Sequence, residues 1–388
     1  MERFAFERRP QVAFQLFKYF PYGGLQRDFL RVAEACRDRG LAVRVYTLSW
    51  QGEVPEGVDV VEVPVDGLAN HDRYRRFAAW VAGDLAWRPV ACVVGFNKLP
   101  GLDVYYAADP CFEEKARELR LSLYRYTRRY RLFSSFERAV FDPGAATRVL
   151  LISPRQRAIF QRYYRTPAER FQLLPPGVAP DRRPGPDAAA ERGRLRQEFA
   201  LADDHLLVLF VGSGFITKGL DRALLALAAL PPALRPRTRL FVIGQDNPSR
   251  FVSQAEDLRV IDQVTFFPGR DDVPRFLQGA DVLLHPAYME SGGIVLLEAA
   301  IAGLPVIATD VCGFASYIDQ AGAGILVGSP FRQEELNQAL RAALEHPEQR
   351  QRWSSNGLAF GRSADIYDMP QRAADAIEDV IGEPALSA

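Results

Sequence analysis

Two carboxylates eight positions apart form the clearest chemical pattern in this sequence. Glu290 follows a short apolar run, and Glu298 lies in an apolar segment that begins just after Gly292 and Gly293. Glycines at the start of a helix leave backbone N–H groups free for a phosphate. We therefore expect Glu290 to bind sugar hydroxyls, Glu298 to bind ribose hydroxyls, and the amides between them to bind a phosphate. A structural salt bridge is the second interpretation of Glu298, because an unpaired carboxylate among apolar residues is costly.

A glycine-rich loop with a lysine forms the second pattern. The apolar run 208–211 leads into GSGFITKG (212–219), and Arg222 follows in a helical segment. The loop is neither the dinucleotide-binding glycine motif nor a P-loop. It still suits a diphosphate, because helix N-terminal amides and the charges of Lys218 and Arg222 would meet there. For Lys218, the alternative is a solvated surface position.

A third loop, KYFPYGG (18–24), ends a predicted strand and precedes a predicted helix. Its two glycines, Gly23 and Gly24, would let the backbone approach a ligand closely. A simple tight turn explains the same pair equally well.

Alternating strands and helices must position these loops. Short aliphatic runs predict buried parallel strands, and the longer segments between them have helical spacing. Predicted strands are 12–17, 42–48, 58–63, 91–95, 104–107 and 148–152, then 206–212, 239–244, 264–268, 282–285, 305–308 and 325–327. Predicted helices include 25–39, 73–87, 154–164 and 365–381.

Two series of strands predict an α/β protein with two doubly wound, Rossmann-like domains. Residues 177–187 are rich in Pro, Gly and charge, as a linker would be. We expect a first domain at 1–177, a second at 178–362, and a C-terminal helical segment at 363–388 that crosses back to the first. Ligands bind at the carboxyl ends of such strands, so the expected site is a cleft between facing domains.

Composition excludes several classes of function. The 48 Lys and Arg balance the 48 Asp and Glu, so no net charge indicates a nucleic-acid partner. The four cysteines and four histidines are scattered, which fits a reducing compartment and argues against a disulfide framework or a metal site. No signal peptide or apolar stretch of about 20 residues is visible. We expect a cytosolic protein, either free or lying on a membrane.

The sequence resembles glycosyltransferase family 4, a retaining group with the two-domain GT-B fold. The likeness rests on the two glutamates, on the glycine loop with its lysine, and on the segments 18–28, 95–105, 173–177 and 285–288. These segments are most similar to members that add a hexose to the inner-core heptose of lipopolysaccharide. Only the extreme N-terminus looks like an extension.

The resemblance implies a role for each candidate residue. Asp109, Lys218 and Glu290 would be catalytic, with Asp109 near the anomeric carbon and the acceptor. The donor would be bound by Gly23, Gly24, Lys218, Arg222, Arg270, Glu290, Gly292, Gly293, Ile294 and Glu298. Lys218 and Arg222 would neutralise the diphosphate in place of a metal ion, and no cofactor is implied. Asp28 would face the acceptor, unless it is a helix-surface residue.

Two departures from the family pattern concern the donor. Ser213 stands where the family has arginine, so the grip on the diphosphate would depend more on Lys218. Ser291 stands where the nearest relatives have a smaller residue. Glucose is the default donor sugar, with galactose-type and N-acetylhexosamine donors as alternatives.

Residues 112–141 predict one long helix with unusual surface chemistry. Apolar positions recur on one face at Phe112, Ala116, Leu119, Leu123, Tyr126, Tyr130 and Phe133. Between positions 115 and 131 the basic residues are Lys115, Arg117, Arg120, Arg125, Arg128, Arg129 and Arg131, against one acid, Glu118. Such a helix suits an anionic membrane, at roughly 1 kcal/mol per basic residue, and with Lys98 it would also meet acceptor phosphates. A core-packed helix with a solvated basic face is the alternative.

The expected function is transfer of a hexose from a UDP-sugar to the lipopolysaccharide inner core, at the cytoplasmic face of the membrane. Catalysis would consist of positioning and of stabilising the departing diphosphate. No nucleophile is apparent, so the family implies a front-face route with retention. A sugar-nucleotide 2-epimerase and a non-catalytic membrane adaptor are the alternatives.

Overall fold

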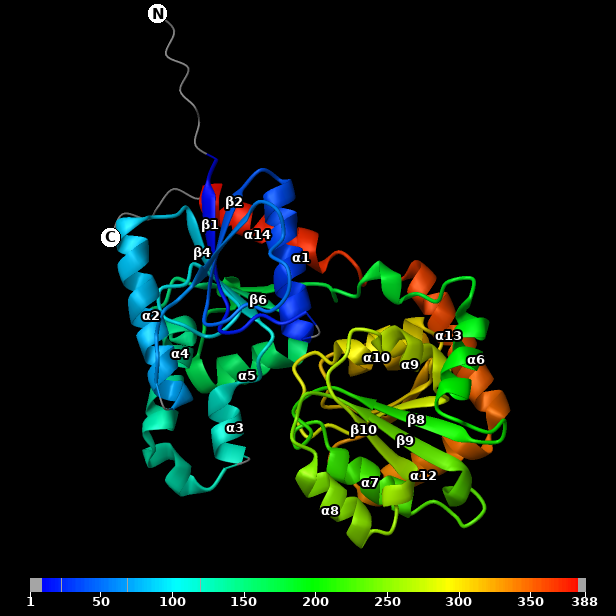
Figure 1. Cartoon of the computed structure of the whole chain (residues 1–388). Helices are drawn as coiled ribbons and strands as arrows, with labels where there is room; N and C mark the ends of the chain where they lie inside the picture. The colour runs from blue at the N-terminus through cyan, green and yellow to red at the C-terminus, as the bar shows by residue number, and fades with distance from the viewer. Residues whose placement is uncertain (1–8, 22, 68, 119, 383–388) are drawn as a thin grey trace, which may run out of the picture. The chain divides into compact units, whose positions relative to one another are not determined.

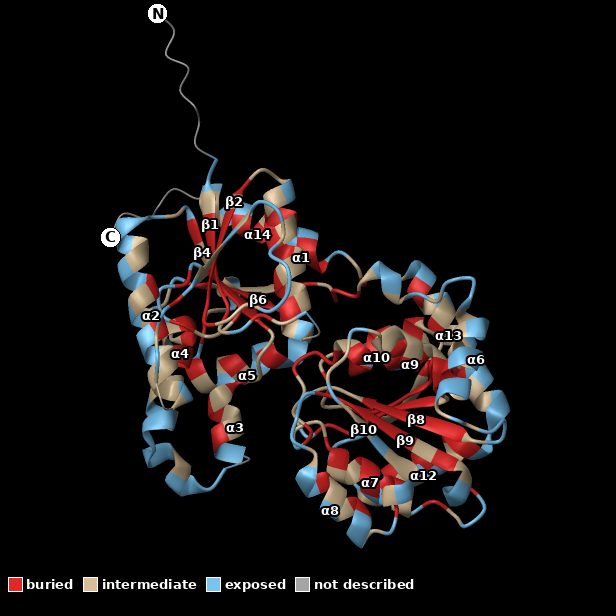
Figure 2. Ribbon diagram, viewed as in Figure 1, coloured by how far each residue is buried: buried red, intermediate tan, exposed pale blue. Residues whose placement is uncertain are grey.

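The computed structural model describes residues 9–21, 23–67, 69–118 and 120–382. The chain forms two compact units: the first runs up to Pro175 and resumes at Asp368, and the second is Pro176–Tyr367. These boundaries lie close to the ones expected at 177 and 362. Each unit has a buried parallel sheet (red in Figure 2) covered by helices whose outward faces are exposed.

The first unit is built on a seven-stranded parallel sheet in the order β3-β2-β1-β4-β5-β6-β7. Figure 1 labels its strands β1, β2, β4 and β6. Its strands are β1 (Gln11–Gln15), β2 (Ala42–Thr47), β3 (Val58–Glu62), β4 (Cys92–Gly95), β5 (Val104–Ala107), β6 (Arg148–Leu151) and β7 (Phe171–Leu173). The order reverses between β1 and β4, which are hydrogen-bonded neighbours. Loops that follow these two strands therefore leave one edge side by side.

Helices pack on the two faces of this sheet because successive strand residues point to opposite sides. They are α1 (Gly24–Asp38), α2 (Asn70–Trp87), α3 (Phe112–Glu118), η1 (Ser122–Tyr126), α4 (Arg128–Phe141), α5 (Pro154–Tyr164), η2 (Ala168–Arg170) and α14 (Met369–Gly382). Ala13 joins a core cluster with Phe77, Val140 and Phe160 of α2, α4 and α5. The next residue, Phe14, meets Phe29 of α1 on the other face, with ring centroids 5.9 Å apart.

The second unit has a six-stranded parallel sheet in the order β10-β9-β8-β11-β12-β13. Its strands are β8 (Leu206–Val211), β9 (Thr238–Ile243), β10 (Val264–Phe267), β11 (Val282–His285), β12 (Val306–Thr309) and β13 (Gly324–Val327). Here the order reverses between β8 and β11, which pair directly. Their following loops must therefore lie together, although they are far apart in the sequence.

The helical elements of the second unit are η3 (Pro180–Arg182), α6 (Ala188–Glu198), α7 (Leu220–Ala228), η4 (Arg235–Arg237), α8 (Ser249–Asp257), η5 (Ile261–Gln263), α9 (Val273–Gly279), α10 (Ile294–Ile301), α11 (Ala315–Ala321), α12 (Gln333–Glu345) and α13 (Pro347–Ser363). Leu224 and Leu340, from α7 and α12, pack with Phe210 of β8 in one buried cluster. The core thus fixes β8 and β11 beneath the two loops.

The predicted single helix over 112–141 is wrong. The segment is divided into α3, η1 and α4. Thr127 ends η1 and caps α4, since its Oγ1 accepts a hydrogen bond from the N–H of Tyr130 at 3.1 Å. A threonine in this position starts a new helix. Leu119, one of the predicted apolar positions, lies outside the described residues.

Candidate functional site

Two loops meet at the carboxyl edge of the second sheet, where the strand order reverses. The β8–α7 loop carries Lys218, and the β11–α10 loop carries Glu290. Backbone hydrogen bonds join them: the N–H groups of Tyr288 and Met289 both donate to the carbonyl of Thr217, at 2.8 and 3.3 Å. The two sequence patterns therefore form a single site.

Lys218 and Glu290 form an ion pair in this site. Their side chains are only 20% and 16% exposed. Burial alone would favour the neutral acid, but the Lys218 ammonium, with a further contribution from His285, holds the pKa of Glu290 well below its usual value. A solvated surface position for Lys218 is excluded by this contact.

His285 is a component of the site that the sequence analysis missed. Its imidazole is fully buried at the end of β11, and Nε2 lies 3.5 Å from Oε2 of Glu290. Burial lowers the pKa of His285, against the opposing effect of Glu290. A histidine closing an otherwise aliphatic buried strand, five residues before the glutamate, was the available signal.

Glycines let the two loops approach each other. Gly219 has φ +76°, and a Cβ there would lie 2.1 Å from the carbonyl oxygen of Pro286. Gly212, with φ +134°, leaves space that the Lys218 side chain occupies, because a Cβ would meet Lys218 Cδ and Cε at 2.8 Å. The glycine loop therefore directs the lysine toward Glu290.

Arg222 is engaged with the protein itself. Its guanidinium donates to the carbonyls of Pro286 and Ala287, both at 3.1 Å. It also lies over the rings of Tyr288 and Phe331, at 3.5 and 3.6 Å from their centroids. Arg222 thus holds the β11–α10 loop on α7, and its predicted contact with a diphosphate stays a prediction.

The start of α10 lies directly after Glu290. Gly293 adopts φ +83° as the N-cap residue, and no side chain caps the helix. The amides of Gly292 and Gly293 directly precede the helix and that of Ile294 begins it, where N–H groups have no intrahelical acceptor. Ser291 beside them is 1% exposed, and its Oγ makes no hydrogen bond within the described residues.

Glu298, in the middle of α10, is paired with an arginine. Its side chain is 5% exposed and lies 3.5 Å from Nε of Arg182, which is 11% exposed. The structural salt bridge considered from the sequence is therefore present. A contact between Glu298 and ribose stays a prediction, and Arg182 is a second residue that the sequence analysis missed.

Arg270 follows β10 on the same edge of this sheet. Its guanidinium donates to both carboxylate oxygens of Asp272, at 2.5 and 2.7 Å, and lies over the ring of Phe276. The hydrogen bond from Arg270 lowers the pKa of Asp272. Arg270 is thus held in one orientation, and its predicted contact with uracil stays a prediction.

In the first unit, Asp109 follows β5 at the carboxyl edge of the sheet. Burial raises the pKa of Asp109, against the charges of Lys98 and Lys115. A carboxylate in such surroundings is poised for proton transfer or for a hydrogen bond to a hydroxyl.

Lys98 is engaged with the protein itself, and its predicted contact with acceptor phosphates stays a prediction. Its side chain is 10% exposed and pairs at 2.5 Å with Glu137, which is fully buried. It also donates to the carbonyl of Pro110 at 2.6 Å. Glu137 in turn accepts from the N–H groups of Phe112 and Glu113, so this pair fixes the loop that presents Asp109.

Gly23 and Gly24 lie at the start of α1, at the reversal point of the first sheet. A Cβ on Gly23 would meet Gln26 Oε1 at 1.9 Å, so any side chain there would have to displace the side chain of Gln26. Asp28, one turn into α1, accepts a hydrogen bond from the buried Tyr106 hydroxyl at 2.8 Å. Asp28 is therefore tied to β5 and is not a free helix-surface residue.

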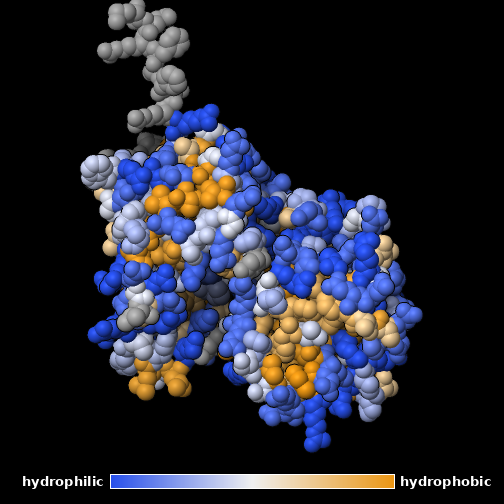
Figure 3. Space-filling view, viewed as in Figure 1, coloured by the Kyte–Doolittle hydropathy of each residue, from blue (hydrophilic) through white to orange (hydrophobic). Residues whose placement is uncertain are grey.

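The segment between α3 and α4 projects apolar and basic side chains together. The exposed apolar residues are Leu121, Leu123 and Tyr126, at 83%, 73% and 74% exposure, and Figure 3 shows an orange patch at the lower end of this unit, over that segment. Exposed arginines around it are Arg120, Arg125, Arg128, Arg129 and Arg131. Arg117 is instead paired with Glu113 at 2.6 Å, and burial lowers the pKa of the partly buried Lys115. No helix in the described part of the chain has the length and apolar character needed to cross a membrane.

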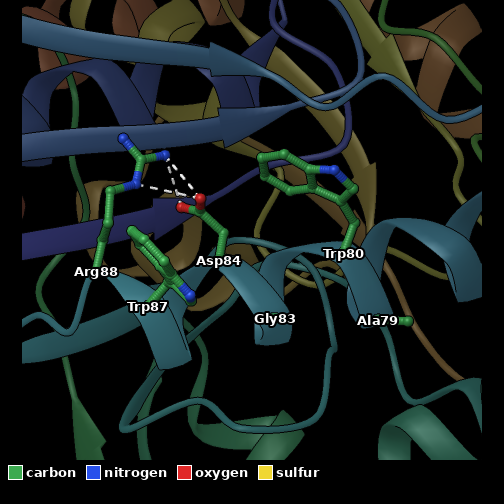
Figure 4. A pocket seen from close by; sticks show the side chains of 6 residues that line it. All are labelled: Ala79, Trp80, Gly83, Asp84, Trp87 and Arg88. Carbon is green, nitrogen blue, oxygen red and sulfur yellow. Dashed lines mark hydrogen bonds and ion pairs between the residues drawn. The ribbon is translucent and has the colours of Figure 1, made fainter.

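A separate cavity of about 430 Å³ lies on α2, lined by Ala79, Trp80, Gly83, Asp84, Trp87 and Arg88 (Figure 4). Asp84 there is held by Arg88 at 2.7 Å and accepts from the hydroxyl of Tyr46. None of the predicted site residues lines it.

Among the described residues, no group of three His, Cys, Asp or Glu side chains could hold a metal ion. All four cysteines are free and buried. Burial raises the pKa of Cys312, the one nearest Glu290, to about 12, so this thiol is protonated at neutral pH.

Comparison with known proteins gives a consistent result. The chain is 49% identical over 366 residues to the lipopolysaccharide glucosyltransferase WaaG of Escherichia coli (strain K12), covering 94% of this chain and 98% of that protein. A crystal structure of WaaG, described as a glycosyltransferase involved in lipopolysaccharide biosynthesis, superposes with a TM-score of 0.91 at 48% identity, covering 94% of this chain and 99% of the other.

A more distant solved structure, Anabaena HepE in complex with UDP and glucose, has a TM-score of 0.74 at 19% identity, over 96% of this chain and all of that one. At that identity the likeness shows the GT-B fold alone. Residues 191–360 match the family described as glycosyl transferases group 1. With both glutamates, the glycine loop and its lysine assembled at one sheet edge, the chain belongs to the group 1 glycosyltransferases.

Proposed function

We propose that this glycosyltransferase moves a hexose, glucose by default, from a UDP-sugar to the inner-core heptose of lipopolysaccharide. The observation that carries the proposal is the contact of Lys218 with Glu290 beside the start of α10. A fixed cation, helix amides and a carboxylate suit the diphosphate and hydroxyls of a nucleotide sugar. The high identity to WaaG supports the lipopolysaccharide acceptor.

Catalysis proceeds by a front-face displacement that retains the anomeric configuration. The bond from the anomeric carbon to the diphosphate breaks, the bond to the acceptor oxygen forms, and the acceptor proton passes to the leaving phosphate. Lys218 and the amides of Gly292, Gly293 and Ile294 stabilise the departing charge without a metal ion. Glu290 holds the donor sugar hydroxyls.

Asp109 acts near the anomeric carbon and the acceptor, with Asp28 in support. Its raised pKa suits a side chain that shares a proton with a heptose hydroxyl. The Lys98–Glu137 pair, buried behind it, keeps its loop in place.

The remaining donor contacts come from residues that the protein already orients. Glu298, held by Arg182, accepts from the ribose hydroxyls. Arg270, fixed by Asp272, contacts the uracil. Gly23 and Gly24 contact the diphosphate from the first unit, and Arg222 adds positive potential while it holds the loop of Glu290.

The segment between α3 and α4 binds an anionic membrane at the cytoplasmic face. Three exposed apolar side chains surrounded by arginines match a surface that inserts shallowly among charged headgroups. The enzyme would thereby meet a lipid-borne acceptor.

A donor screen tests the proposed function. Purified protein is given heptose-terminated core acceptor with UDP-glucose, UDP-galactose or UDP-N-acetylglucosamine in the presence of EDTA, and the linkage is read by NMR. We expect an α-linked glucose on heptose and its loss in Lys218→Ala and Glu290→Ala, both folded. Transfer that requires a divalent ion, or wild-type turnover in either variant, would contradict the proposal. A parallel reaction without acceptor tests the alternative function, because a 2-epimerase would convert the UDP-sugar to its epimer there.

A further inference from the structure

The imidazole of His285 is buried with its hydrogen bonds unmade. It has no solvent exposure, and neither ring nitrogen makes a hydrogen bond within the described residues. The ring cannot swing away to solvent, because it ends a central strand and lies over Phe210, with centroids 6.2 Å apart. Buried polar groups without a partner destabilise a fold, so their retention calls for a role.

Lys218 and His285 face the same oxygen of Glu290. Lys218 Nζ contacts Oε2, and His285 Nε2 lies 3.5 Å from it. Burial lowers the pKa of His285, so the ring is neutral at neutral pH and carries one N–H. A shift of roughly 0.5 Å would bring Nε2 to hydrogen-bonding distance.

Binding of a nucleotide sugar would deprive Glu290 of its cation. The proposed function, on which this inference rests, has Lys218 turning to the donor's diphosphate. Burial favours the protonated form of Glu290, and the Lys218 ammonium is the largest influence that opposes it. Without a replacement donor, Glu290 would take up a proton and accept fewer hydrogen bonds from the sugar.

We propose that His285 is a positioning residue, which donates a hydrogen bond from Nε2 to Glu290 when Lys218 moves to the diphosphate. Glu290 then stays ionised and oriented toward the donor sugar throughout the reaction. The exchange also explains the unmade hydrogen bond of Nε2, because in the proposal this bond forms only in the donor complex.

Two substitutions separate hydrogen bonding from packing. His285→Phe keeps a flat ring over Phe210 but cannot donate, whereas His285→Gln keeps an N–H near the position of Nε2. For each variant, kcat and KM for UDP-glucose are measured from pH 5 to 8, with thermal unfolding alongside. The titratable groups that face Glu290 are Lys218, His285 and Cys312, and the Cys312 thiol stays protonated over this range.

We expect His285→Phe to lower kcat/KM by about 10- to 100-fold, as the loss of a hydrogen bond to a charged group does. The acidic limb of the kcat–pH profile of His285→Phe should move to higher pH, because Glu290 would then be protonated more readily. His285→Gln should recover most of the wild-type rate and bring the acidic limb back toward its wild-type position. A wild-type profile in His285→Phe, or a His285→Gln variant no better than it at equal stability, would overturn the inference. Absence of transfer by the wild-type protein would instead overturn the proposed function.

Should His285→Phe fail to fold, ¹⁵N NMR of the wild-type protein gives the answer. The chain has only four histidines, so the ring signals are readily assigned. Addition of UDP-glucose should shift His285 Nε2 to the position of a hydrogen-bonded N–H. An unchanged signal at saturating donor would reject the proposed contact.

Discussion

Lys218 and Glu290 neutralise each other in a largely buried site, with 20% and 16% of their side chains exposed. A buried ion pair is a weak source of stability, because desolvation of both charges offsets most of their attraction. Removing one partner is different, since it leaves the other charge buried alone. The pair therefore contributes little to holding the fold together, which fits the ligand-binding roles proposed for both residues.

This reasoning predicts a pH-dependent loss of stability in Lys218→Met. The pKa of Glu290 lies below its unfolded value of 4.5, so its ionisation stabilises the wild-type protein above that pH, and this contribution is lost as the pH falls through the folded pKa. We expect the variant to lose about 2 kcal/mol of unfolding free energy at pH 7 and less toward pH 4. Urea unfolding at several pH values measures this. The double variant Lys218→Met with Glu290→Leu should regain the lost unfolding free energy. A loss in Lys218→Met that does not change with pH would show that the ionisation of Glu290 is not its cause.

Sequence patterns identified the residues with full charges and conspicuous spacing. They singled out Lys218 and Glu290, which the structure brings into contact, because a glycine loop and two glutamates eight positions apart are recognisable from sequence alone. The sequence did not single out His285, Arg182 or the unsatisfied hydroxyl of Ser291. Their importance depends on burial and on contacts with residues distant in the chain, which no local pattern reveals.

At the scale of the elements, the glycine loop after β8 lets the loop after β11 pack closely against it. Gly219→Ala should cost about 1 kcal/mol for its left-handed backbone and more for the clash with the Pro286 carbonyl. Gly101→Ala is the matched control, because Gly101 also has positive φ, at +75°, but open space around it. Thermal unfolding should rank Gly219→Ala clearly below Gly101→Ala. Equal unfolding temperatures for the two variants would mean that the close approach of Gly219 to the Pro286 carbonyl does not require glycine.

The segment between α3 and α4 should bind vesicles through charge and apolar contact together. We expect Leu121→Ser with Leu123→Ser, and separately Arg125→Gln with Arg128→Gln, to weaken binding to vesicles with anionic lipid by about tenfold or more. Sedimentation with and without anionic lipid measures this. Arg250→Gln with Arg332→Gln, in the second unit, removes the same charge and should bind normally. If both pairs of arginine substitutions weakened vesicle binding equally, binding would depend only on net charge, and the segment between α3 and α4 would have no special role.

Elements were predicted best where a run of apolar residues is buried on both sides, as in β8 and β11. The three-residue β7 was missed, because so short a strand has no periodicity. The helix break at Thr127 was missed since the apolar spacing continues across it, although the capping threonine was visible.

On the scale of the whole molecule, the two ends of the described chain belong to one unit. Helix α14 packs on α1, and Arg39 bonds Glu378 at 2.8 Å and Asp375 at 2.7 Å. Residues 176–367 are thus inserted between parts of the first unit, as the C-terminal helical pattern had suggested.

Loss of packing on α14 should therefore destabilise the protein. Ile377 is fully buried in this helix, so Ile377→Ala should cost about 2–5 kcal/mol. Ile216→Ala, at a side chain 58% exposed, is the control and should cost well under about 1 kcal/mol. Chemical denaturation compares the two. Similar losses would show that α14 is dispensable to the first unit.

Calorimetric titration of UDP-glucose into the protein in EDTA tests the central claim most directly, namely that fixed cations and helix amides of the second unit bind the diphosphate. The account predicts binding by the wild-type protein without any divalent ion, and a loss of about 100-fold or more in Lys218→Met. Binding that appears only when Mg²⁺ or Mn²⁺ is added, or that Lys218→Met leaves unchanged, would contradict it.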